Sequence, residues 1–250
     1  MFRKSFHRVM LTHEAMALIE RERGHDGPLI VAGSHASWWD PLFALRLAEA
    51  FMPERTLCAP IEMEQYERFG VLRKLGLFGL DQHHADALPR MIDHVEQRVV
   101  AEPNLLFCIT PQGEFSDVRR PIRIRPGVAA VAAALPGARV LALCGEYAFW
   151  QDRRPEVFWH ARPCEAEGEP TTARWHRVIR DTMRRVAAEL AECVIARDEL
   201  AFVGLPDEKR AGGAAVHPFY DLWLRLRGVG TRIESSADAV KRPSAPGDAS

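Results

Sequence analysis

The stretch "PLIVAGSHASWWDPLF", Pro28 to Phe43, contains a complete change of local structure within one short segment. Its first part, 29–33, is an apolar run bounded by Pro and Gly, which predicts a buried β-strand. Its last part begins with Asp40 and Pro41, residues typical of the start of a helix, with Asp40 as the N-cap. The segment therefore predicts a strand, a turn and a helix, and it places a histidine, two serines and two tryptophans in the turn.

The same alternation continues along the chain. Further strands are predicted at 55–61, 77–81, 104–110, 139–147 and 156–163, and further helices at 62–76, 87–103, 127–135 and near 172–197. This order predicts an α/β fold, a single domain with a mostly parallel central sheet flanked by helices. We divide the chain into an N-terminal amphipathic helix (1–24, helical from 2 to 23), the α/β domain (25–205), a C-terminal amphipathic segment (206–230) and a disordered tail (231–250).

Composition excludes several classes of protein. Lys and Arg total 33 against 34 Asp and Glu, so no overall positive field argues for nucleic acid. Five cysteines without a C-x-x-C pair indicate reduced thiols in a cytosolic setting. We expect no cleaved signal peptide, and no apolar stretch is long enough to cross a bilayer. The expected location is cytoplasmic, peripherally associated with the inner face of the membrane.

His35 and Asp40 are the first candidates for chemistry. In open α/β sheets, ligands gather where strands end and helices begin, and His35 follows the strand at 29–33. A histidine can take a proton from a hydroxyl near neutral pH, and a carboxylate on its other ring nitrogen fixes the tautomer. Asp40 supplies that carboxylate if the turn folds back. The alternative is that Asp40 only caps the helix and His35 is a satisfied turn residue.

A second candidate segment lies at 108–117, "CITPQGEFSD", again after an apolar strand. Pro, Gly and polar residues in such a turn expose backbone N–H groups that favour an anion. Four arginines follow in "VRRPIRIRPGVAAVAA", 118–133, before a helix of small residues. A solvated basic loop is the alternative interpretation of these arginines.

Taken together and in order, these stretches resemble the glycerolipid and lysophospholipid acyltransferase family. The family's H-x-x-x-x-D block corresponds to "SHASWWD", its Gly-x-Phe segment to "GLFGLD" (76–81), and its Phe-Pro-Glu-Gly-Thr-Arg-Ser block to "TPQGEFS" (110–116). The basic Pro-Gly segment that follows matches "RPGVAAVA", and the last apolar strand would be "RVLALCGEY". The resemblance covers residues 29 to 147, and its first block is the most specific.

The resemblance implies transfer of a fatty acyl group from acyl-CoA or acyl-carrier protein to a lipid hydroxyl, without an acyl-enzyme and without a cofactor beyond the thioester co-substrate. His35 is then the general base and Asp40 orients it. Acceptor binding falls to Gln112, Gly113, Glu114, Phe115, Gly76 and Phe78, and the donor phosphates to Arg119, Arg120, Arg123 and Arg125. The expected partners are the acyl thioester, the lipid acceptor and a membrane surface, with no metal and no nucleic acid.

The third block departs from the family at two positions. Gln112 and Phe115 stand where the family usually has Glu and Arg, which are associated with binding a phosphate-bearing acceptor. Loss of the guanidinium removes a bidentate phosphate contact. We therefore predict an uncharged acceptor, such as a glycolipid, a glycosylated isoprenoid or another lipid alcohol, over lysophosphatidic acid. The alternative is that the arginines at 119–125, which lie beyond the turn, compensate.

Other interpretations stay open at this stage. The altered third block is also compatible with a catalytically reduced lipid-binding or scaffold protein of the same fold. A serine hydrolase would use Ser34 or Ser37, although the chain has no G-x-S-x-G motif. The segment 217–228 and the N-terminal helix are either membrane-contacting or packed on the core. His83 and His84 lack a third spaced ligand and are assigned to a polar loop rather than to a metal site.

Overall fold

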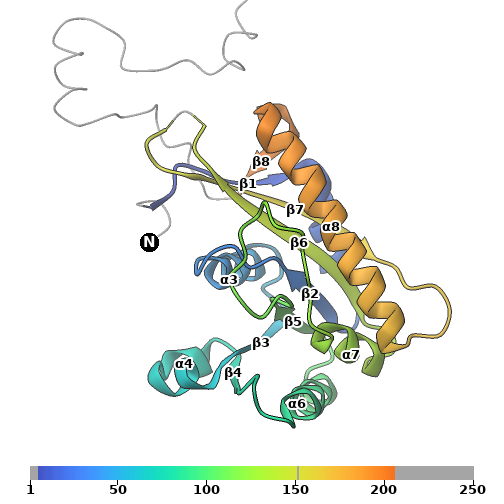
Figure 1. Ribbon diagram of the computed structural model, residues 1–250. Helices are drawn as coiled ribbons and strands as arrows, with labels where there is room; N and C mark the ends of the chain where they lie inside the picture. Colours follow the sequence, from blue (N-terminus) through green and yellow to red (C-terminus); the bar gives the residue numbers. More distant parts are fainter. Residues whose placement is uncertain (1–4, 151, 206–250) are drawn as a thin grey trace, which may run out of the picture.

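The structure is a computed structural model, and it describes residues 5–150 and 152–205 (Figure 1). The predicted segments 206–230 and 231–250 therefore lie outside the described residues. One eight-stranded sheet forms the centre of the fold. Its strands are β1 (Val9–Thr12), β2 (Leu29–Gly33), β3 (Thr56–Glu62), β4 (Leu77–Leu80), β5 (Leu105–Ile109), β6 (Arg139–Ala148), β7 (Glu156–Cys164) and β8 (Phe202–Gly204).

The strand order is β4-β3-β5-β2-β6-β7-β1-β8. The five strands from β4 to β6 in this order run parallel, whereas β7 is antiparallel to β6, β1 is parallel to β7, and β8 is antiparallel to β1. The expected α/β fold with a mostly parallel sheet is confirmed. Because β5, β2 and β6 are adjacent and parallel, their carboxyl ends meet at one edge of the sheet.

Helices cover both faces of the sheet (Figure 1). On one face lie α6 (Ala87–Ala101), α7 (Gly127–Ala134) and α8 (Thr172–Ala196); on the other lie α2 (His13–Arg23) and α3 (Asp40–Phe51). Successive side chains of a strand point to opposite faces, so Ile30 and Ala32 of β2 pack on the α6–α8 side and Leu29 packs on the α2–α3 side. Burial on both faces explains why 29–33 is continuously apolar.

Two expected helices differ in the structure. Residues 2–23 are not one helix: β1 occupies 9–12, and α2 begins only at His13, capped by the Thr12 hydroxyl, which accepts a hydrogen bond from the Ala15 amide at 3.1 Å. β1 is buried on both faces, so its unbroken apolar run also matched a helical spacing. The predicted helix at 62–76 is divided into α4 (Met63–Arg68) and α5 (Val71–Lys74) at Gly70, a poor helix former.

The cysteines are structural. All five are free, and burial raises the pKa of Cys58 to about 11 and that of Cys108, Cys144 and Cys164 to about 12. These thiols stay protonated at neutral pH, so they are poor nucleophiles and poor metal ligands. Among the described helices, none is long and apolar enough to cross a membrane.

Candidate functional site

The turn that carries His35 is fixed between two neighbouring strands. At the end of β2, the Ser34 amide donates to the Leu143 carbonyl at 2.9 Å, and the Ser34 hydroxyl oxygen accepts from the Gly145 amide at 2.9 Å. Ser34 is buried. The Ser37 hydroxyl oxygen likewise accepts a backbone hydrogen bond, from the Trp39 amide at 3.2 Å. Both serine hydroxyls thus hold the backbone in shape, and no hydrogen bond joins either one to the His35 ring among the described residues.

The turn folds back and brings His35 and Asp40 together. His35 Nδ1 lies 3.3 Å from Asp40 Oδ2, and the same carboxylate oxygen accepts from the Ser37 amide at 2.7 Å. Since an ionised carboxylate only accepts, the proton lies on Nδ1 of the imidazole. The other ring nitrogen, Nε2, then carries a lone pair, and within the part of the chain that the structure describes it has no hydrogen-bond partner.

Asp40 is not the helix cap that the sequence predicts. The N-cap of α3 is Trp39, which makes no side-chain cap, and Asp40 is the first helical residue. Its carboxylate points back into the turn rather than toward the free amides of α3, and Asp40 is only 4% exposed. Burial, together with the hydrogen bonds to Ser37 and His35, indicates that Asp40 organises the His35 turn.

Tyr147 is the member of the site that sequence reasoning missed. It lies near the end of β6, and its hydroxyl donates to Asp40 Oδ1. Burial, together with the adjacent Asp40 charge, raises the pKa of Tyr147, so the hydroxyl stays protonated and remains a donor. Its segment, "RVLALCGEY", was recognised as a strand, but only the parallel pairing of β6 with β2 reveals that Tyr147 reaches Asp40.

The third block holds the backbone of His35 from the other side. The Gln112 side-chain oxygen accepts from the His35 amide at 2.8 Å, and the Ser116 amide donates to the His35 carbonyl at 2.8 Å. A glutamine oxygen accepts this hydrogen bond as a carboxylate oxygen would, without the added strength that a negative charge gives. The structure therefore gives Gln112 a positioning role, whatever the identity of the acceptor.

One exposed aromatic ring lies against the imidazole, and a second is exposed in the same turn. The Phe115 ring lies 4.4 Å from the His35 ring, at an interplanar angle of 38°, and Phe115 is 61% exposed. Trp38, in the same turn as His35, is 56% exposed and stacks on Trp39 at 4.7 Å. Large exposed apolar side chains cost solvation energy, and such groups commonly mark a binding surface.

Arg125 follows the third block in the sequence, and in the structure its side chain lies against that block. Gly113 has a φ of 72°, and a Cβ at this position would be 2.7 Å from Arg125 Nε. The Arg125 amide also donates to the Pro111 carbonyl at 2.7 Å, and its Nη1 donates to the Gln82 side-chain oxygen at 2.9 Å. A glycine at 113 is what allows the guanidinium to lie over the turn.

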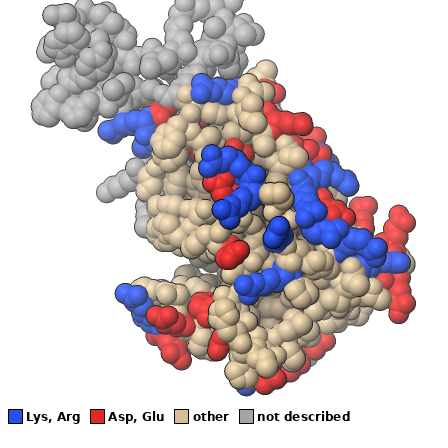
Figure 2. Space-filling model, viewed as in Figure 1, with Lys and Arg blue, Asp and Glu red and all other residues tan. Residues whose placement is uncertain are grey.

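Arg119 and Arg120 line an open hollow beside Phe115. Its volume is about 520 Å³, and it is lined by Phe115, Asp117, Arg119 and Arg120. Arg119 already pairs with Asp117 at 2.6 Å and, chiefly by hydrogen bonding, lowers the pKa of that carboxyl. Arg120 and Arg123 are exposed. Among the described residues neither forms a salt bridge, although the charge of Arg120 also helps to lower the pKa of Asp117. Figure 2 shows Lys and Arg side chains gathered on the face that carries the 111–126 segment and α8, with acidic side chains between them.

The other predicted site residues lie apart from His35 or in solvent. Glu114 is exposed on the turn. Phe78 is 8% exposed and stacks on His94 at 4.1 Å, and Gly76, with a φ of 83°, lets the chain pass the Leu57 carbonyl, which a Cβ would approach to 2.1 Å. Packing accounts for both residues. Phe78 lies on β4 and Gly76 directly precedes it, and β3 and β5 stand between β4 and β2 in the sheet.

His83 and His84 form a polar turn before α6. The His83 amide donates to the Asp81 carboxylate at 3.0 Å, and His84 Nδ1 accepts from the Asp86 amide at 3.2 Å. No group of three His, Cys, Asp or Glu side chains within residues 5–150 and 152–205 is placed to hold a metal ion.

Comparison with known proteins leaves the family open. No protein-family profile matches the chain, and no curated protein is similar to it in sequence. Among solved structures, the pilus retraction motor PilT with bound ADP is similar over 82% of this chain at 9% identity, with a TM-score of 0.33. The chain spans 65% of the length of that structure. A similarity at this level carries no argument about activity.

Proposed function

We propose that this protein is an acyltransferase that moves a fatty acyl group from a coenzyme A or carrier-protein thioester to the hydroxyl of a lipid. The observation that carries the proposal is the imidazole of His35, which is held through Nδ1 by Asp40 while Nε2 has no hydrogen-bond partner among residues 5–150 and 152–205. A free ring nitrogen beside a buried carboxylate is the arrangement that a general base requires.

The chemistry balances on these groups alone. Nε2 of His35 takes the proton of the acceptor hydroxyl while its oxygen attacks the thioester carbonyl carbon. The tetrahedral intermediate collapses, the C–S bond breaks, and the departing thiolate takes the proton back from Nε2. The products are an ester and a free thiol. Asp40 stabilises the imidazolium that exists between the two proton transfers, and Tyr147 holds the second oxygen of Asp40.

Two surfaces beside His35 suit the two substrates. The hollow at Arg119 and Arg120 offers guanidinium groups to the phosphates that a donor thioester carries. Phe115 presents an apolar face against the imidazole, and the guanidinium of Arg125 is already engaged with Gln82. These contacts support an uncharged lipid alcohol as the acceptor rather than a lysophosphatidic acid.

The test is thiol release from a panel of thioester donors, offered with neutral lysolipids, glycolipids and lysophosphatidic acid, with mass spectrometry of the acylated product. His35→Ala should lower turnover by about 10²- to 10⁴-fold because the general base is lost. His84→Ala, which alters an exposed histidine, is the matched control and should leave turnover unchanged. Absence of thiol release for every pair, in the presence of lipid binding, would leave a binding protein in place of the enzyme.

A further inference from the structure

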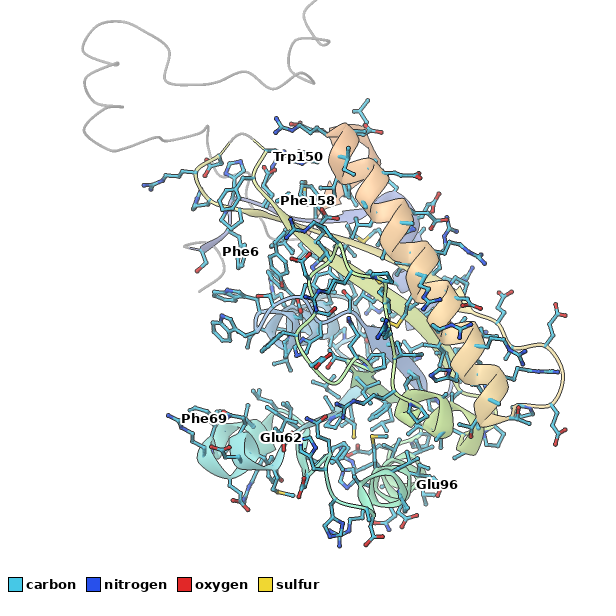
Figure 3. All side chains as sticks on the ribbon, in the orientation of Figure 1. Phe6, Glu62, Phe69, Glu96, Trp150 and Phe158 are labelled. Carbon is cyan, nitrogen blue, oxygen red and sulfur yellow. The ribbon has the colours of Figure 1, made fainter. Side chains whose placement is uncertain are left out.

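α4 and α5 form a short arm that packs Met63 and Tyr66 against β4 at Gly79 but leaves three other apolar side chains exposed. Neither helix contains a buried residue. Phe69 is 46% exposed, Val71 is 60% exposed and Leu75 is 41% exposed. Figure 3 shows Phe69 at the outer edge of this arm, and Glu62 where the arm leaves the sheet. A helix that only covered the sheet would turn its apolar residues inward, so this composition needs another explanation.

The same arm carries a group of basic side chains. Arg68, Arg73 and Lys74 are all exposed. α4 also carries the exposed Glu64 and Glu67, but both precede Arg68, and no acidic residue lies between Arg68 and Leu75 in the sequence. The Arg68 guanidinium lies 5.2 Å from the centre of the Phe69 ring. Exposed apolar and basic side chains in one short segment match the chemistry of an anionic bilayer surface, because rings and aliphatic chains enter the acyl boundary while cations meet the phosphates.

The position of the arm relates this surface to the candidate site. α4 begins at Met63, directly after the carboxyl end of β3, and β3 runs parallel to β5, which runs parallel to β2. The arm therefore leaves the same edge of the sheet as the His35 turn. In Figure 1, α3 and α4 lie in the left half of the view, and α8 lies in the right half.

We propose that the α4–α5 surface, formed by Arg68, Phe69, Val71, Arg73, Lys74 and Leu75, docks the protein on an anionic phospholipid bilayer. The docking itself needs only this surface, whereas the purpose we assign to it, delivery of a lipid acceptor to the edge that carries His35, rests on the proposed function. The two segments for which the sequence left membrane contact open, the N-terminal helix and residues 217–228, do not include this surface.

The experiment measures sedimentation of the full chain with phosphatidylcholine vesicles that contain or lack phosphatidylglycerol. The double variant Phe69→Ser/Val71→Ser should bind the anionic vesicles about tenfold or more weakly, because two apolar side chains leave the bilayer boundary. Arg73→Gln/Lys74→Gln should lower binding to anionic vesicles by more than roughly tenfold, at about fivefold for each charge, and should not alter binding to neutral vesicles. The matched control is Val100→Ser on α6, where the side chain is 85% exposed, and it should bind as the wild type does.

Three results overturn the proposal. The first is vesicle binding that is unchanged in both double variants, and the second is an equal loss of binding in Val100→Ser. The third is a change of oligomeric state in Phe69→Ser/Val71→Ser without a change in vesicle binding. That result would make the arm an interface between two copies of the chain. Thermal unfolding of each variant verifies that it is folded. Thiol release with a water-soluble acceptor is measured in parallel. Docking without release refutes only the enzyme, whereas release that survives loss of docking is the expected result and shows that the α4–α5 surface acts in docking and not in the chemical step.

Discussion

The substitution Asp40→Asn separates a catalytic role of this carboxylate from a structural one. The asparagine oxygen can take the place of Oδ2, where it still accepts from the Ser37 amide and from His35 Nδ1. The new NH₂ group then faces Tyr147, whose hydroxyl can turn and accept a hydrogen bond instead of donating one. Each contact of the turn has a replacement, so the fold and the histidine tautomer should survive.

What the variant loses is the negative charge beside the imidazolium. Two unit charges about 4 Å apart interact by about 4 kcal/mol at the effective dielectric typical of a protein surface. The amide dipole retains part of this interaction, so we expect the barrier to rise by about 3–4 kcal/mol, which is roughly a 10²- to 10³-fold loss of kcat. The melting temperature should fall by only a few degrees.

The assay is thiol release under saturating donor, together with thermal unfolding of the same preparations. Asp86→Asn is the matched control, because Asp86 is exposed, lies 3.7 Å from His84 and sits in an unrelated turn. Asp86→Asn should alter neither quantity. A large fall in the melting temperature of Asp40→Asn with undiminished turnover would refute the catalytic assignment and leave Asp40 as a residue that only holds the turn.

Three further outcomes are expected. Tyr147→Phe leaves one oxygen of the buried Asp40 without its donor, so the free energy of unfolding should fall by about 1–3 kcal/mol in urea titrations, and unchanged stability would contradict this hydrogen bond. In competition at equal concentrations, a neutral lipid alcohol should be acylated faster than lysophosphatidic acid, and Arg125→Ala should change the ratio less than about twofold; faster use of lysophosphatidic acid that Arg125→Ala abolishes would show instead that this arginine binds the phosphate. The pKa of His160 is lowered, because the effect of burial exceeds the opposite effect of its contact with Glu189. The unfolded chain therefore takes up this proton first as the pH falls, so stability should fall below about pH 6.5 and level off below the folded pKa. His160→Gln should flatten that dependence in unfolding experiments, and an unaltered slope would exclude His160 as its origin.

Local sequence patterns were sufficient for most of the fold. The apolar run at 29–33 became β2 with the expected bounds. The helix after it begins at Asp40, so its N-cap is Trp39, one residue before the predicted N-cap Asp40. Local sequence patterns failed where a strand and a helix produce the same pattern of apolar residues. Val9 to Thr12 form a strand buried on both faces, and an unbroken apolar segment of that kind has no period that distinguishes it from one turn of a buried helix.

The sequence by itself determined the alternation of strands and helices and the five-residue spacing of His35 and Asp40, because both depend on contacts between near neighbours in the chain. Tertiary structure decided the rest of the candidate site. Gln112 reaches the His35 amide, and Tyr147 reaches Asp40, only because β5, β2 and β6 are adjacent and parallel. Strand order depends on how both faces of the whole sheet are buried. That burial sums contacts between segments far apart in the chain, so no short stretch of sequence predicts it.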